Sequence, residues 1–214
     1  MQIKKRFIWL NILFCVITLG IYGIYWFYTL TEDSNKISPE HATASGSKAI
    51  LLSIVTLGIY GYYWHYKLGL KTYRQFRSGA MELFLCIIGL GFLNFILCQT
   101  EINTYAEIPD NIPKKRNIAL SIFLSFITLG VYYLYWRLSI IEESNTICPE
   151  IKLPNADTCH TLSLVTLHIY SLYWGYKVAK RLGLNASLCV FLNIFAEFVT
   201  LAIAQNKINK EYAV

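Results

Sequence analysis

One short motif occurs four times in this chain and constrains its fold more than any other feature. The first copy, from Ile17 to Trp26, reads Ile-Thr-Leu-Gly-Ile-Tyr-Gly-Ile-Tyr-Trp. Further copies occupy Val55–Trp64, Ile127–Trp136 and Val165–Trp174. The pattern Thr-Leu-Gly-[Ile/Val]-Tyr-x-x-Tyr-Trp holds throughout three copies, and the fourth departs from it only at His168, where the others have glycine. Self-similarity of this kind indicates a protein built from repeats.

The shared positions of the motif follow the spacing of a helix face. Tyr22, Tyr25 and Trp26 stand at i, i+3 and i+4, so they lie on one side of an α-helix. Glycine lets helices approach closely, and threonine hydroxyls bond locally or to a neighbour. We therefore assign the motif a structural role in packing and interfacial anchoring. Its residues are Thr18, Gly20, Tyr22, Tyr25, Trp26, Thr56, Gly58, Tyr60, Tyr63, Trp64, Thr128, Gly130, Tyr132, Tyr135, Trp136, Thr166, Tyr170, Tyr173 and Trp174.

A second, longer repeat relates the two halves of the chain. At an offset of 110 residues, the Lys-Lys-Arg of residues 4–6 aligns with residues 114–116, and the acidic stretch of residues 32–35 aligns with residues 142–145. Each half contains two motif segments and a third apolar segment, which are joined by an acidic loop and a basic loop. The predicted tandem units are residues 1–112 and residues 113–214.

The composition favours a membrane protein. Hydrophobic residues make up 55% of the chain and charged residues only 15%, whereas about a quarter of a typical soluble domain is charged. Six apolar runs carry little charge, and several reach the roughly 17 to 25 residues that a membrane-spanning helix needs. The runs are Phe7–Leu30, Ala49–Tyr66, Leu83–Cys98, Asn117–Ile141, Thr161–Tyr176 and Leu188–Ala204. Because an isolated segment in lipid satisfies its backbone only as a helix, we predict an all-α, polytopic membrane protein.

The spacing of charged and aromatic residues suggests how the segments cross. Arg6 to Trp26 corresponds to about 30 Å of helix, which matches the hydrocarbon core. Lysine and arginine are enriched on the cytoplasmic side. This preference is met best if each half crosses twice through its motif segments, while the third run dips into the membrane or lies at the interface. In this multi-pass arrangement in the cell membrane the N-terminus is cytoplasmic, Trp26 and Trp136 mark the outer interface, and Trp64 and Trp174 mark the inner one.

Two other arrangements remain open at this point. All three segments of each half could cross, which would give the inverted repeat of many transporters. Alternatively, each Thr-Leu-Gly could form the tip of a short hairpin that never crosses, with both acidic loops facing the cytoplasm. Gly89 and Gly91 offer a bend in the third run of the first half, whereas Leu188–Ala204 contains no glycine.

Glu197 is the one carboxylate deep within an apolar run. An ionisable residue inside a membrane is a functional-site hypothesis by default. Its candidate partner is His168, the residue that breaks the motif, and such a pair would suit transport or proton movement. The first half has Gly91 at the position of Glu197, so the carboxylate is not part of the duplicated design.

Other chemistry is sparse. The tyrosine and tryptophan faces could cage a quaternary ammonium or a lipid headgroup, but an interfacial aromatic belt and helix packing explain them more simply. The formal charge of +6 is concentrated at the ends of the apolar runs rather than along one face, which argues against a nucleic-acid partner. The sequence has no metal-ligand spacing, phosphate loop or catalytic pair, so we predict no enzyme activity, no cofactor and no metal.

The motif copies, with the basic residues before them and Glu-x-Ser-Asn after them, resemble the bacterial integral-membrane family called domain of unknown function 4234. That family is marked by a Thr-x-Gly-Ile-Tyr-x-x-Tyr-Trp signature. The resemblance covers Lys4–Tyr66 and Lys114–Lys177 well and the third apolar runs poorly, and His168 and Val131 depart from the signature. It implies a prokaryotic membrane location and a helical fold, but no activity, ligand or catalytic residue.

We expect a membrane module without catalysis that scaffolds partners or contacts lipid, with basic loops attracted to anionic headgroups. Its partners would be membrane lipids, together with another membrane protein or a second copy of the chain. The alternative is a small transporter or channel with Glu197 in its path.

Overall fold

The computed structural model describes residues 3–71, 78–106, 113–151 and 153–213. Within them every regular element is helical, which confirms the predicted all-α class. The chain divides into two compact units, Met1–Pro109 and Asp110–Val214. The boundary expected after residue 112 falls at residues 107–112, which lie outside the described residues.

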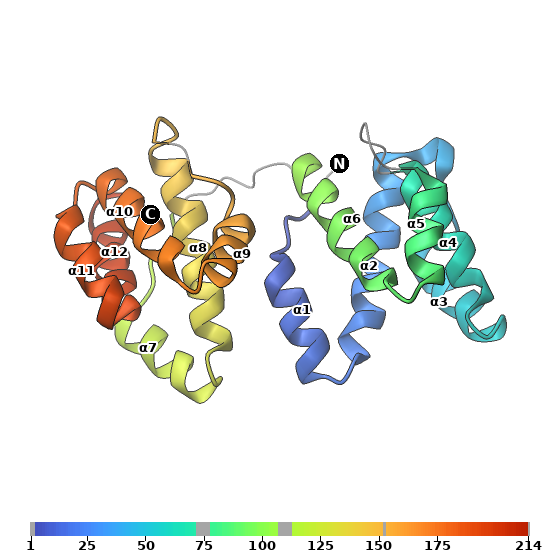
Figure 1. Cartoon of the computed structure of the whole chain (residues 1–214), viewed down its shortest axis with the longest axis horizontal. Helices are drawn as coiled ribbons and strands as arrows, with labels where there is room; N and C mark the ends of the chain where they lie inside the picture. The colour runs from blue at the N-terminus through green and yellow to red at the C-terminus, as the bar shows by residue number, and fades with distance from the viewer. Residues whose placement is uncertain (1–2, 72–77, 107–112, 152, 214) are drawn as a thin grey trace. The chain divides into compact units, whose positions relative to one another are not determined.

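The described helices pair into three hairpins in each unit (Figure 1). The first unit contains α1 (Ile8–Ile17), α2 (Ile21–Ile37), η1 (Pro39–His41), α3 (Gly46–Val55), α4 (Ile59–Lys71), α5 (Gly79–Ile87) and α6 (Gly91–Tyr105). The second unit contains α7 (Ile118–Ile127), α8 (Val131–Ile147), α9 (Ala156–Val165), α10 (Ile169–Arg181), α11 (Ala186–Phe195) and α12 (Glu197–Glu211).

Each apolar run is a helical hairpin rather than a single helix. α1 ends at Ile17, the chain turns at residues 18–20, and α2 returns beside α1 (Figure 1). The predicted unbroken helices from Arg6 to Trp26 and through the equivalent stretch of the second half are therefore wrong. The structure has Thr-Leu-Gly at the hairpin tip, as in the last arrangement considered above. In the part of the chain that the structure describes, every helix is too short or too polar to cross a membrane.

The reversal at each motif follows from its Thr-Leu-Gly sequence. Leu19 has a left-handed backbone with φ 49°, and Gly20 follows with φ 90°. The Gly20 amide donates to the Cys15 carbonyl at 2.7 Å, which is the bond that closes a Schellman helix end. The Thr18 hydroxyl donates to a carbonyl of α1 at 2.7 Å and accepts from an amide of α2 at 2.9 Å, so it joins the two helices. These features recur in all four copies.

The third apolar run of each unit also turns back on itself, without the motif. α5 leads into α6 through Gly89, which has φ 82°. In the second unit the chain turns between α11 and α12 at Ala196, with φ −156°. Because φ at this turn is negative, it lies outside the left-handed region that favours glycine, so Leu188–Ala204 turns without one.

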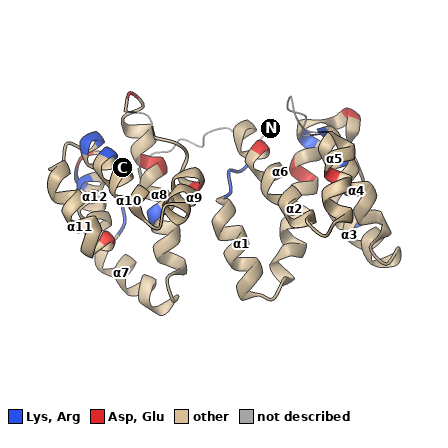
Figure 2. Cartoon of the chain, in the orientation of Figure 1, with Lys and Arg blue, Asp and Glu red and all other residues tan. Residues whose placement is uncertain are grey.

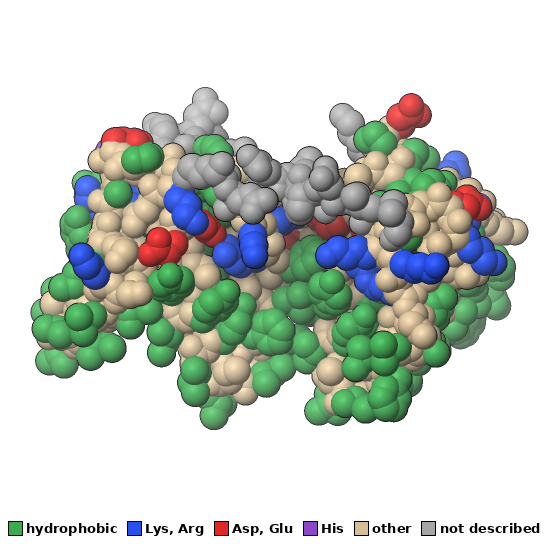
Figure 3. Space-filling model, turned by 180° about the vertical axis from the view of Figure 1, so that it is seen from behind, with side chains coloured by type: hydrophobic (Ala, Val, Ile, Leu, Met, Phe, Trp, Pro, Cys, Tyr) green, Lys and Arg blue, Asp and Glu red, His purple; other side chains and the backbone are tan. Residues whose placement is uncertain are grey.

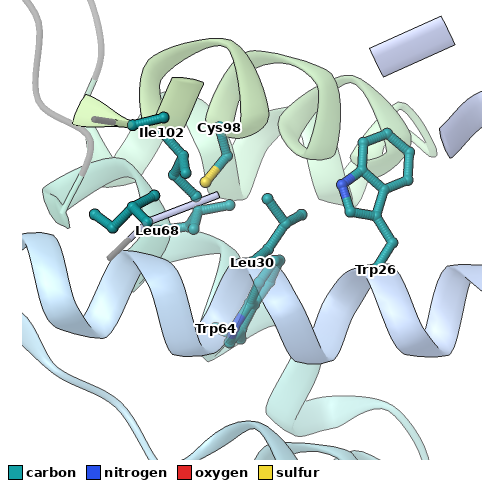
Figure 4. Packing of buried hydrophobic residues seen from close by; sticks show 8 residues of the cluster. Trp26, Leu30, Trp64, Leu68, Cys98 and Ile102 are labelled. Carbon is teal, nitrogen blue, oxygen red and sulfur yellow. The ribbon is translucent and has the colours of Figure 1, made fainter. Parts of the chain in front are cut away.

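The motif tryptophans form the centre of each unit. Their exposed fractions are 5% for Trp26, 1% for Trp64, 0% for Trp136 and 0% for Trp174. In the first unit the two tryptophans pack with Leu30, Leu68, Cys98 and Ile102 (Figure 4). The indole N–H of Trp26 donates to Gln99 at 3.0 Å, and that of Trp136 donates to Gln205 at 3.0 Å. The prediction that these tryptophans mark membrane interfaces is wrong, because all four indole rings are buried inside the fold.

Candidate functional site

The four motif hairpins end in exposed leucines. Leu19, Leu57, Leu129 and Leu167 are 93%, 94%, 94% and 86% exposed. Each has a left-handed backbone conformation that costs a residue other than glycine roughly 1 to 2 kcal/mol. An exposed apolar side chain gains nothing from water to offset that cost. The tips are therefore suited to an apolar environment.

Further apolar side chains surround the tips (Figure 3). In the first unit the exposed ones are Val16, Ile17, Ile21, Ile24, Ile54, Val55, Ile59, Ile87, Ile88, Leu90 and Phe92. In the second unit they include Phe126, Ile127, Val165, Ile169, Phe195 and Phe198. Soluble monomers seldom expose contiguous apolar patches beyond a few hundred Å², and larger ones mark contacts with proteins or membranes.

Charged residues gather at the end of each unit away from the tips (Figure 2). In the first unit, residues 7–31, 49–66 and 83–100 contain no lysine, arginine, aspartate or glutamate. In the second unit, Arg137 and Glu197 interrupt this pattern. Each unit thus has an apolar end and a polar end.

The Glu-x-Ser-Asn stretch joins the hairpins at the polar end. Glu32 accepts from the Gly46 amide at 2.6 Å and so satisfies the first amide of α3. Asp33 pairs with Arg6 at 2.5 Å, which holds the N-terminal segment against α2. The equivalent contacts of the second unit are Glu142 with the Ala156 amide at 2.8 Å and Glu143 with Arg116 at 2.7 Å.

Lys71 completes this set of contacts from the end of α4. Its ammonium donates to Asn35 at 2.5 Å and to Thr43 at 2.9 Å, and the residue is only 5% exposed. Burial lowers the pKa of Lys71 to about 8. The second unit places Arg181 at this position, where its guanidinium donates to Asn145.

The hairpins of the first unit surround an apolar cavity of about 780 Å³. Gly20 and Gly89 lie along it, which places it at the tip end. Its wall is rich in aromatic rings and contains Trp26, Phe27, Phe92 and Phe95. None of the described lining residues is a lysine, arginine, aspartate or glutamate. The imidazole of His65 forms part of the wall.

The second unit holds an ion pair in the corresponding region. Arg137 Nε donates to Glu197 Oε1 at 2.5 Å, and Arg137 Nη2 donates to Ser163 at 2.9 Å. Its Nη1 lies 2.6 Å from His160 Nδ1, and its guanidinium carbon lies 5.1 Å from the centre of the Trp174 ring. Arg137 is 1% exposed. The ion pair is therefore enclosed by neighbouring polar and aromatic groups.

The expected pairing of Glu197 with His168 is wrong. Glu197 begins α12, which packs against α8, and α8 carries Arg137. His168 lies instead at the tip of the α9–α10 hairpin with φ 67°. It replaces the glycine of a turn.

The two units differ at equivalent positions around this region. Tyr133, Arg137 and His160 stand where the first unit has the cavity-lining residues Gly23, Phe27 and Ile50, and Glu197 stands where it has Gly91. A cavity of about 560 Å³ remains beside Tyr133 and Glu197. The second unit thus has more polar and charged side chains in this region than the first, on equivalent helices.

The motif tyrosines lie outside the tryptophan core. Within each copy the two rings are in contact, with centroids 5.4, 5.6, 5.7 and 5.3 Å apart in chain order. Tyr25, Tyr63 and Tyr173 are exposed. The tryptophan of each copy is buried, so it does not contribute to a cation cage with these tyrosines.

Sequence reasoning overlooked several residues of the site. Gln99 and Gln205 occupy matching positions near the end of each half, but the sequence does not reveal that they accept hydrogen bonds from the buried tryptophans. The burial of Arg137 was not predictable, because charge alone does not reveal that a side chain is enclosed. Nothing in the sequence indicated that His65 faces a cavity.

A family model described as Domain of unknown function (DUF4234) matches residues 6–74, 44–103 and 116–184. Together these segments cover more than half of the chain. The chain belongs to the DUF4234 family. Each match spans two successive hairpins, so the DUF4234 unit is a hairpin pair, and the match ending at residue 103 extends the likeness over the third apolar run of the first unit. No curated protein and no solved structure matches the chain.

Proposed function

We propose that each unit is a membrane-embedded module that inserts its hairpin tips into the bilayer and contacts lipid, without catalysis of its own. The observation that carries this proposal is the set of four exposed tip leucines in a strained backbone conformation. Burying a leucine side chain contributes about 1.5 to 3 kcal/mol, which offsets the cost of its backbone conformation.

The depth of the hairpins supports insertion from one side. α1 has 10 residues, which corresponds to about 15 Å of helix and therefore to about half of a hydrocarbon core of roughly 30 Å. Such a hairpin enters one leaflet and returns to its starting side. The N-terminus and the loops between hairpins would then be cytoplasmic at the cell membrane, where each basic residue gains about 1 kcal/mol from anionic headgroups.

The transporter alternative rests on Glu197 and is supported less well. A carboxylate on a transport path must be free to exchange partners, whereas Glu197 is held by the buried Arg137 at 2.5 Å. A Glu197→Gln variant in reconstituted vesicles checks this directly. Loss of uptake or proton flux with the fold intact would favour transport, and unchanged flux is the result that the lipid-contacting module predicts.

The insertion proposal is tested by measuring depth. An environment-sensitive fluorophore is attached to Leu57→Cys or Leu167→Cys in a chain whose native cysteines are replaced by alanine, and the protein is reconstituted with lipids that carry nitroxide quenchers. We expect the strongest quenching from nitroxides within the acyl chains. Glu40→Cys, at the polar end, is the matched control and should be quenched from the headgroup region. Tip probes that respond like Glu40→Cys would overturn the proposal.

A further inference from the structure

His65 has a defined tautomer in the wall of the cavity of the first unit. Its Nδ1 lies 2.8 Å from Asn94 Nδ2, and that amide nitrogen also lies 2.7 Å from the carbonyl oxygen of Glu82. A carbonyl can only accept, so the Asn94 atom is the donor nitrogen and His65 Nδ1 is an acceptor. The imidazole is therefore neutral and carries its proton on Nε2.

The Nε2–H group is open to the cavity because glycine stands beside it. His65 is 8% exposed and lines the cavity. A Cβ atom at Gly91, which lines the same cavity, would lie 3.3 Å from Nε2. The absence of a side chain at Gly91 thus leaves a buried hydrogen-bond donor facing an apolar space.

We propose that this cavity binds a quinone-type lipid, with one ring carbonyl accepting the His65 Nε2–H hydrogen bond. The rings of Trp26, Phe27, Phe92 and Phe95 suit a flat conjugated ring, since aromatic groups pack favourably in offset or edge contacts. The uncharged wall disfavours a carboxylate or a phosphate. The volume of about 780 Å³ lies within the range of roughly 300 to 1,000 Å³ that small-molecule sites occupy.

The comparison of the two units assigns this site to the first unit alone. Tyr133, Arg137 and Glu197 stand at the positions of Gly23, Phe27 and Gly91, and they add bulk and charge where the first unit is open. One quinone per chain is the expected stoichiometry. The entry route, from the bilayer between the hairpin tips, rests on the proposed membrane insertion, whereas binding itself depends only on the cavity.

The test is titration of the full chain in detergent with decylubiquinone, monitored by quenching of tryptophan fluorescence, because Trp26 lines the cavity. We expect saturable quenching. Gly23→Tyr, which installs the residue that the second unit carries, should weaken binding at least about tenfold. Gly61→Tyr is the matched control, since it occupies the same motif position, has open space around its Cβ and lies outside the cavity. It should bind as the unaltered chain does.

His65 is tested separately. His65→Leu removes the donor and should weaken binding about fivefold, the value of one neutral hydrogen bond, while His65→Gln, which keeps an N–H donor, should lose less. Quenching without saturation, or Gly23→Tyr binding as tightly as Gly61→Tyr, would overturn the proposal. So would complete displacement of the quinone by decanol at equal concentration, which would identify an acyl-chain site. Because the titration uses detergent, its failure leaves the depth measurement of the tips unaffected.

Discussion

Arg137 and Glu197 form a 2.5 Å ion pair in the second unit at the positions where the first unit has Phe27 and Gly91 beside an open cavity. The duplicated helices are thus retained while the groups between them differ. A buried ion pair of this kind is weak evidence for stability, but removal of one partner leaves an uncompensated charge. The pair is therefore best understood as a replacement for apolar packing.

Breaking the pair should destabilise the second unit strongly. We expect Glu197→Ala to lower the free energy of unfolding by about 3 to 5 kcal/mol, because Arg137 would stay buried without its partner. The double variant Arg137→Phe with Glu197→Gly installs the pair of the first unit and should recover most of that loss. Denaturant unfolding in detergent, followed by circular dichroism, measures both. A double variant less stable than Glu197→Ala contradicts this account.

The tip at His168 should be strained relative to the other three. His168 has φ 67°, whereas Gly20, Gly58 and Gly130 have φ 90°, 90° and 89° at the same position. His168→Gly should raise the free energy of unfolding by about 1 kcal/mol, because glycine adopts this backbone without a Cβ clash. Gly58→His is the converse control and should lower stability by a similar amount. If both substitutions are neutral, the turn does not impose the strain described.

Lys71 gives the first unit a pH dependence that the second unit lacks. Burial lowers its pKa from the ordinary 10.5 to about 8, so between these values the unfolded chain binds more protons than the folded chain. The free energy of unfolding should therefore rise with pH across this window. Below pH 8 Lys71 is protonated in both states, and the full cost of burying its ammonium lowers the stability of the folded chain. Lys71→Arg, which copies Arg181, stays charged and should remove the rise. The free energy of unfolding of the unaltered chain and of Lys71→Arg is measured from pH 7 to 10.5. If it changes with pH in the same way in both proteins, Lys71 is not the source of the rise.

The tryptophan contacts also make a specific prediction. Trp64 donates its indole N–H to Thr31 at 2.9 Å, whereas the Trp174 N–H has no hydrogen-bond partner among the described residues, and Ile141 stands where the first unit has Thr31. Thr31→Val should cost about 1 to 3 kcal/mol by leaving a buried donor unpaired. The same unfolding assay measures it, with Ile141→Val as the control that removes no hydrogen bond and should cost about 0.5 to 1.5 kcal/mol. A Thr31→Val loss below about 1 kcal/mol would contradict the role given to Thr31.

The repeats and the helical class were predictable because they rest on local patterns. Apolar runs and the offset of 110 residues are visible in the chain itself. The hairpin was harder to predict, since Leu19 adopts a left-handed backbone that leucine rarely takes, and glycine is common within membrane helices. A Thr-Leu-Gly stretch was therefore interpreted as the middle of one helix.

The contacts within the site depend on residues far apart in the sequence. Trp26 meets Gln99 across 73 positions, and Arg137 meets Glu197 across 60. Periodicity reports which side of a helix a residue occupies, but not which helix lies opposite. This is why the tryptophans were placed at membrane interfaces and why Glu197 was matched with the wrong partner.

The side of the membrane on which the acidic loops lie tests the central claim most directly. Short epitopes are inserted after Glu40, Ser78 and Glu150, one at a time, and antibody access is compared in intact spheroplasts and in inverted membrane vesicles. Hairpins that enter and leave from one side predict that all three epitopes are accessible only in inverted vesicles. Epitopes after Glu40 and Glu150 that are accessible in spheroplasts, with the one after Ser78 protected, would contradict this account and establish that the motif segments cross the membrane.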